Sequence, residues 1–191
     1  STVNITNALD ELGYDYDYVG VPANQPGPDL DSDTPAYGTV MLKDYNSIIW
    51  NTGSEDVDTL MAQDVDNLID YLDGKYTEAQ EFPDEIRGTL LLTGQGVVDE
   101  LMDASYAGQG TNFLQNYLNI DITNIDYSSG LPSEVYGVYG DGISHGMEYP
   151  TVDAYPDETD AFGVRAGADG LFKTVSGDWG EDGEWDDYAP A

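Results

Sequence analysis

The stretch Gly88–Leu101 constrains the fold of this chain more than any other. Within it, Thr89–Thr93 is an apolar, β-favouring run without polar alternation, which predicts a strand buried on both faces. Gly94-Gln95-Gly96 then predicts a tight turn, and the apolar residues at positions 97, 98, 101 and 102 follow at the spacing of one helix face. Strand, glycine turn and helix form the unit around which doubly wound sheets place their sites, at the carboxyl ends of the strands. We therefore predict an α/β fold.

The segments before this unit show the patterns of two helices and two strands. Tyrosine alternates with aspartate after the first helix, which predicts a strand near a sheet edge, and the next strand is apolar and buried. Glycine marks the end of each helix, and Asp56 or Asp58 is the predicted N-cap of the second one. In order, the predicted elements are a helix over Val3–Leu12 that ends at Gly13, strands over Tyr14–Val21 and Tyr45–Asn51, and a helix over Thr59–Leu72 that ends at Gly74.

The pattern changes after the strand–turn–helix unit. Thr111–Asn119 predicts another short helix, and short β-like pieces follow from Ile120 onward. One of these pieces, residues 162–175, predicts a hairpin that turns at Gly167–Gly170. From the length of 191 residues we predict one domain over residues 1–175 with a β-rich C-terminal extension, followed by an acidic tail over residues 176–191.

The charge of the chain is extreme. Its 38 acidic residues face 5 basic ones, which gives a net charge of −33, and Asp outnumbers Glu by 27 to 11. So few cations exclude nucleic acid and anionic membrane surfaces as partners. High salt reduces such self-repulsion, since the Debye length falls to about 3 Å at 1 M, and clustered carboxylates suit calcium. We expect halophilic salt adaptation or calcium dependence, and the two are compatible.

Two groups of carboxylates are candidate calcium ligands. Asp29, Asp31 and Asp33 repeat the spacing that starts an EF-hand loop, but Thr34 and Val40 stand where that loop needs glycine and glutamate. A looser calcium site that also uses backbone carbonyls is the alternative there. The tail offers a second group, for calcium or for contact between subunits, with a solvated acidic tail as the alternative. This group includes Asp178, Glu181 and Asp182.

Few residues of the chain suit catalysis. It contains no cysteine, and the middle residue of the glycine turn is Gln95, which is not a nucleophile. Its one histidine, His145, has no partner recognisable by spacing. Gly94, Gln95 and Gly96 form a candidate ligand site through their backbone N–H groups, unless the glycines only permit the turn. We predict that the protein is not an enzyme.

Several segments, taken in their order and spacing, resemble a domain of the class I glutamine amidotransferase-like, flavodoxin-like superfamily that occurs in secreted bacterial and archaeal surface proteins and peptidases. The resemblance implies a three-layer sandwich with a mostly parallel sheet and an extracellular or cell-surface location. It carries over no activity, because those amidotransferases use a cysteine where this chain has Gln95. The matching segments cover most of Asn7–Asp157 and include TNALDELGYDYDYV, YNSIIWNTGSED, LLLTGQGV, NFLQNYLN and VYGVYGDGISHGMEY.

The resembled family has a central strand ahead of its first helix, whereas this sequence starts at the helix. We expect that strand to have been cleaved off or deleted, or to come from another chain by strand addition. The sequence favours a non-catalytic extracellular domain with a structural or adhesive role, such as a subunit of a cell-surface assembly or filament. Its partners would be further copies or an upstream strand-donating fragment. The alternative is an accessory or degenerate catalytic domain of a secreted hydrolase that acts on peptides or glycans.

Overall fold

The structure is a computed structural model that describes residues 2–22, 24–53, 60–75, 88–94, 97–106, 108–126, 134–137, 148–150, 161–166, 168 and 172–174. The chain divides into two compact units, Ser1–Phe113 and Leu114–Ala191. Helices and strands are both present, as the sequence predicts. The tail over residues 176–191, with Asp178, Glu181 and Asp182, lies outside the described residues.

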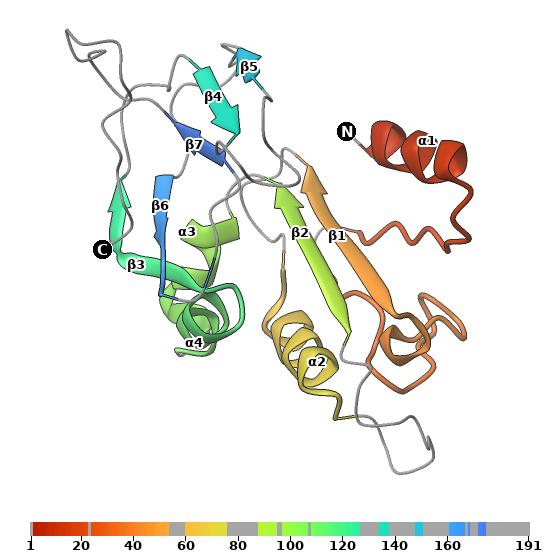
Figure 1. The fold of residues 1–191 in the computed structure, drawn as a ribbon. Helices are drawn as coiled ribbons and strands as arrows, with labels where there is room; N and C mark the ends of the chain where they lie inside the picture. Colours follow the sequence, from red (N-terminus) through yellow and green to blue (C-terminus); the bar gives the residue numbers. More distant parts are fainter. Residues whose placement is uncertain are drawn as a thin grey trace, which may run out of the picture. The chain divides into compact units, whose positions relative to one another are not determined.

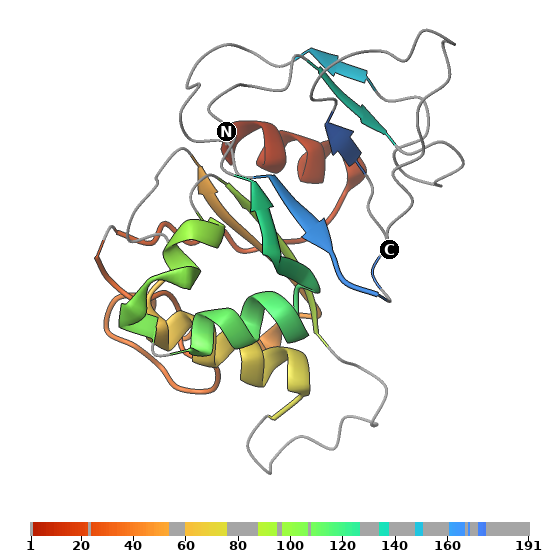
Figure 2. The ribbon, with the colours of Figure 1, turned by 90° about the vertical axis from the view of Figure 1, so that its left-hand side faces the viewer.

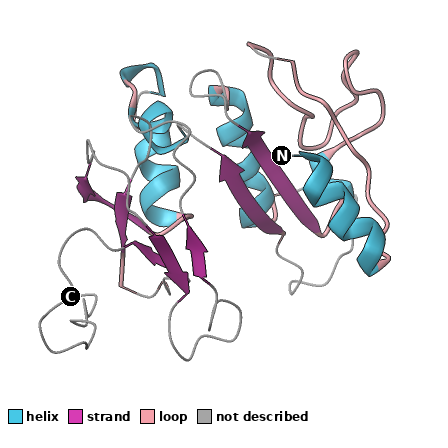
Figure 3. Cartoon of the chain, turned by 90° about the horizontal axis from the view of Figure 1, so that it is seen from above, coloured by secondary structure: helices cyan, strands magenta, loops and turns pink. Residues whose placement is uncertain are grey.

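The first unit is built on a parallel pair of strands, β1 (Ser47–Gly53) and β2 (Thr89–Gly94). Their register places Ile49 opposite Leu91 and Trp50 opposite Leu92. Helix α1 (Thr2–Leu12) lies beside β1, on the side that faces away from β2, as seen in Figure 1 and from above in Figure 3. The parallel pair with its helices confirms the predicted α/β class.

The helices of this unit agree with the apolar periodicity of the sequence. Helix α1 ends at Gly13 (φ +75°) and α2 (Ala62–Asp73) ends at Gly74 (φ +69°), because glycine adopts this left-handed conformation without a Cβ clash. The prediction that Asp56 or Asp58 caps α2 is wrong. The N-cap is Met61, whose backbone N–H donates to a carboxylate inside the first turn of the helix.

The buried side chains that form the core of the first unit come from α2 and from the segment after β2, among others. That segment holds α3 (Val97–Met102), a 3₁₀ turn (Ala104–Tyr106) and α4 (Gln109–Asn116), which crosses into the second unit. A second 3₁₀ turn, Leu42–Asp44, contacts α2. The buried apolar side chains of the unit are Leu30, Leu42, Leu60, Val65, Leu68, Tyr71, Val97, Val98, Leu101, Tyr106 and Phe113.

Two predictions about strands are wrong. Tyr14–Val21 forms no strand, and its side chains are exposed apart from the half-buried Val19. The β1–β2 pair is also not buried on both faces: Ile49 is 40% exposed and Leu91 is 55% exposed. Both errors have the same physical origin, since a strand needs a paired neighbour and a buried face needs a covering layer, and neither can be read from local pattern alone.

The second unit is rich in short antiparallel strands. β3 (Ile120–Asp126) pairs with β6 (Ala161–Val164), while β4 (Glu134–Gly137) lies between β5 (Glu148–Pro150) and β7 (Phe172–Thr174), as Figure 2 shows. The predicted hairpin over residues 162–175 is wrong, because its two strands, β6 and β7, pair with different partners in different sheets. None of the helices that the structure describes is long and apolar enough to span a bilayer.

Candidate functional site

The carboxyl end of the β1–β2 pair is the place where the sequence predicts a ligand site. Here the register shifts between Asn51 and Gly53, and Gly53 pairs with Gly94. The Gly53 N–H donates to Oδ1 of Asn51 at 3.1 Å. Gly94 has φ +140°, and a Cβ atom there would collide with the side chain of Thr52. Glycine at position 94 is therefore required by backbone conformation and by the close approach of the two strands.

Of the predicted ligand-binding turn, only Gly94 lies among the described residues, while Gln95 and Gly96 lie outside them. The helix that follows, α3, has six residues, and its Val97, Val98 and Leu101 are buried in the core. The strand and the helix of the unit that the sequence predicts are thus present. The role that the structure gives to its described glycine is structural.

A buried carboxylate lies where α2 begins. Asp64 is 2% exposed and accepts two backbone hydrogen bonds, from Gly27 to Oδ1 at 2.7 Å and from Met61 to Oδ2 at 2.8 Å. Gly27 also has no room for a side chain, because a Cβ atom would lie 2.6 Å from the Trp50 ring. Asp64 thus joins the loop at Gly27 to the start of α2, and Gly27 itself lies against the Trp50 ring of β1.

The environment of Asp64 acts on its protonation in two directions. Burial is the larger effect and raises the pKa of the carboxyl above its ordinary value, while the two backbone N–H donors lower it. Sequence reasoning missed this residue because its partner Gly27 is 37 positions away. The predicted helix begins at Thr59, whereas α2 begins at Ala62, and only the later start places Asp64 in the first turn, where an aspartate can accept from the N-cap backbone.

The predicted calcium ligands Asp29, Asp31 and Asp33 lie in the loop before β1. Oδ1 of Asp29 accepts from the backbone N–H of Asp31 at 3.4 Å, and Oδ1 of Asp31 accepts from Ser32 Oγ at 3.3 Å. Asp33 is exposed. Across the part of the chain that the structure describes, no three acidic, histidine or cysteine side chains come together as a metal site. His145 lies outside that part.

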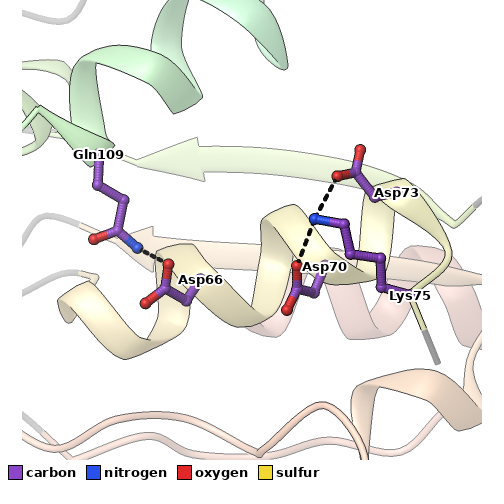
Figure 4. A network of polar contacts seen from close by, with 5 residues as sticks. All are labelled: Asp66, Asp70, Asp73, Lys75 and Gln109. Atoms are coloured by element: carbon purple, nitrogen blue, oxygen red, sulfur yellow. Dashed lines mark hydrogen bonds and ion pairs between the residues drawn. The ribbon is translucent and has the colours of Figure 1, made fainter. Parts of the chain in front are cut away.

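The exposed side of α2 carries a row of acidic side chains with local partners, shown in Figure 4. Nζ of Lys75 lies 3.0 Å from Asp70 and 2.9 Å from Asp73, and these two carboxylates raise the pKa of the lysine. Asp66, one turn earlier, accepts a hydrogen bond from Gln109. These contacts are exposed to solvent, and they set the distribution of charge on the surface of α2.

The largest unusual feature of the first unit is apolar surface exposed to solvent. Leu12 is 72% exposed, Tyr14 is 64% and Tyr18 is 65%, and the Ile49–Leu91 pair on the open face of the sheet adds to them. Of these residues, Ile49 and Leu91 are paired neighbours, and contiguous exposed apolar groups are typical of surfaces that contact another macromolecule.

Comparisons with models of protein families, with curated proteins and with solved structures found no match.

Proposed function

We propose that this chain is a non-catalytic structural or adhesive domain of an extracellular or cell-surface assembly. We further propose that its first unit is part of a flavodoxin-like three-layer sandwich, whose sheet another chain completes. The observation that carries the proposal is the exposed Ile49–Leu91 pair on one face of a parallel β1–β2 sheet.

Parallel sheets occur with both faces covered, and their strands are apolar for that reason. In β1 and β2 the residues of one face, Ile48, Trp50, Leu90 and Leu92, are half-buried. The opposite face exposes Ile49 and Leu91, although the sequence of both strands is that of a fully buried pair. Full burial of an aliphatic side chain stabilises by about 1.5–3 kcal/mol, so covering this face favours association. A further strand or helix from a second chain supplies such cover.

The charge supports an assembly whose formation depends on its ionic surroundings. At −33 per chain, copies repel one another at low ionic strength. High salt or bound calcium reduces that repulsion and leaves the apolar attraction. A salt-rich or calcium-containing extracellular setting provides these conditions, and this is why we place the protein there.

The proposal is tested with charge substitutions on the open face of the sheet. We expect Ile49→Asp and Leu91→Asp to reduce assembly, measured by light scattering in high salt or calcium, because each places an unpaired charge in the contact. Both residues are already exposed, so the monomer keeps its far-ultraviolet circular dichroism. Met102→Asp, at an exposed apolar position on α3, is the matched control and leaves assembly unchanged. Equal effects of all three substitutions, or none, would refute the role of this face.

A further inference from the structure

The chain after α1 has a surface of its own, distinct from the open sheet face. We call it the tyrosine–aspartate segment, Tyr14–Val21. Tyrosine and aspartate alternate from Tyr14 to Tyr18, and all five of these side chains are exposed. Alternation of this kind is typical of a strand, with tyrosines on one face and aspartates on the other.

The backbone of this segment is available for pairing. Among the described residues, no backbone N–H or C=O from Asp15 to Val21 is hydrogen-bonded to another backbone group. A row of unpaired backbone groups with a strand-like sequence is a template on which an extended peptide adds. The segment therefore has both the side chains and the backbone of a strand that lacks its neighbour.

Three contacts hold the segment in place. The backbone N–H of Tyr14 donates to the carbonyl of Leu9 at 3.0 Å, and the Tyr16 hydroxyl donates to Asp10 at 3.1 Å. The Tyr45 hydroxyl, two residues before β1, donates to Oδ2 of Asp17 at 2.6 Å. A segment that is tethered at its start and middle loses less conformational entropy on binding than a free loop.

The charge of the region selects the chemistry of the occupant. Asp10, Glu11, Asp15 and Asp17 lie in or next to the segment, and the first basic residue of the whole chain is Lys43. Arginine matches the aspartate face, because its guanidinium pairs with carboxylates, and the apolar residues between the arginines would lie on the tyrosine face. Lysine provides the same charge without the planar guanidinium that pairs with both oxygens of a carboxylate.

A second copy of this chain is a poor match for the segment. It brings 5 basic residues among 191, and Lys75 is already paired with Asp70 and Asp73. Arg165 donates to the Gln115 carbonyl at 2.6 Å and to Asn116 at 3.1 Å. We propose that the tyrosine–aspartate segment binds an extended, basic segment of a different protein, in which arginine alternates with apolar residues, by strand addition. This site does not depend on the open sheet face.

The test uses the full chain and short synthetic peptides. The probe alternates arginine with valine; one control alternates glutamate with valine, and another has the arginines and valines in separate blocks. Calorimetry should show tight binding of the alternating basic peptide only. Amide hydrogen exchange should then slow at residues 15–21, because strand addition pairs their backbone N–H groups.

Two variants and one matched control locate the site. Asp15→Asn and Tyr18→Ala should each weaken binding of the alternating basic peptide about fivefold, the range for exposed ion pairs and for cross-strand pairs of an aromatic with a β-branched residue. Asp33→Asn removes the same charge at another exposed position and should leave binding within a factor of about two. Two results would overturn the proposal: an equal loss of affinity in Asp15→Asn and Asp33→Asn, or equal affinity for the blocked and the alternating basic peptide. Either would mean that the peptide is held only by nonspecific electrostatic attraction to a chain with a net charge of −33. Slowed exchange of the same amides in a peptide-free dimer would make the occupant a second copy, and would also overturn the proposal.

Discussion

At the scale of single residues, Asp64 is a buried polar group that links two distant parts of the first unit through hydrogen bonds. Among the described side chains it is the one buried charged group, and each of its oxygens accepts a backbone N–H from a different segment. Two residues further along the same helix, Asp66 is exposed. The pair therefore offers a comparison in which burial differs and residue type does not.

We expect Asp64→Asn to lower the free energy of unfolding by about 1–3 kcal/mol. The amide presents a donor to one of the two backbone N–H groups, from Gly27 or Met61, and leaves that buried donor unpaired. Urea unfolding measures the loss. Asp66→Asn is the control and should change the free energy by less than about 0.5 kcal/mol, as for most surface substitutions. Equal losses in the two variants would contradict the structural role of Asp64.

Tyr45 provides a spectroscopic test of the contact that holds the tyrosine–aspartate segment. The hydrogen bond to Asp17, together with burial and the nearby charges of Asp17 and Asp44, raises the pKa of Tyr45 from 10.0 to about 12. A raised pKa in the folded state means that the contact stabilises the fold fully below pH 10.0 and loses its effect as pH rises to about 12.

We expect the tyrosinate absorbance of the wild-type chain to include one group that ionises near pH 12, and Tyr45→Phe to lack it. Asp17→Asn should keep Tyr45 but shift its ionisation toward pH 10.0, because the accepting charge is gone. A difference titration of wild type minus Tyr45→Phe with a midpoint at the ordinary tyrosine value would show that the Tyr45–Asp17 contact is absent in solution.

At the scale of helices and strands, the local sequence pattern predicts which secondary structure a segment prefers. It does not predict which other segment a strand pairs with. The apolar spacing that ends at Gly13 and at Gly74 predicts α1 and α2, and the apolar run at Thr89–Thr93 predicts β2. Helices satisfy their backbone groups internally, so their prediction needs no partner. Glycine at their ends is required locally as well, by a positive φ.

Strand partners are not local, and the failed predictions are of that kind. Tyr14–Val21 has the sequence of a strand and no strand beside it, and residues 162–175 contain two strands that pair elsewhere. Ile49 and Leu91 have the apolar character of a doubly covered sheet and lie on an open face. At the candidate site, the glycine at position 94 was predictable and the role of Asp64 was not, because its bond to Gly27 crosses 37 positions.

At the scale of the whole molecule, two properties of the chain oppose each other. By our proposals, the open sheet face and the tyrosine–aspartate segment contact other chains, while a net charge of −33 keeps like copies apart. The balance depends on the surrounding ions, because at about 1 M salt the Debye length is only ~3 Å and apolar contacts persist. Assembly should therefore depend on salt or calcium, and we expect none in low-salt buffer.

Sedimentation velocity of the purified chain is the most direct test of the proposed assembly. It is run over a range of protein concentrations in low salt, in about 1 M salt, where screening is strong, and in calcium with and without a chelator. The account predicts species larger than the 20.8 kDa monomer in high salt or calcium, with a mass that rises with concentration. A single 20.8 kDa species in every condition would contradict it.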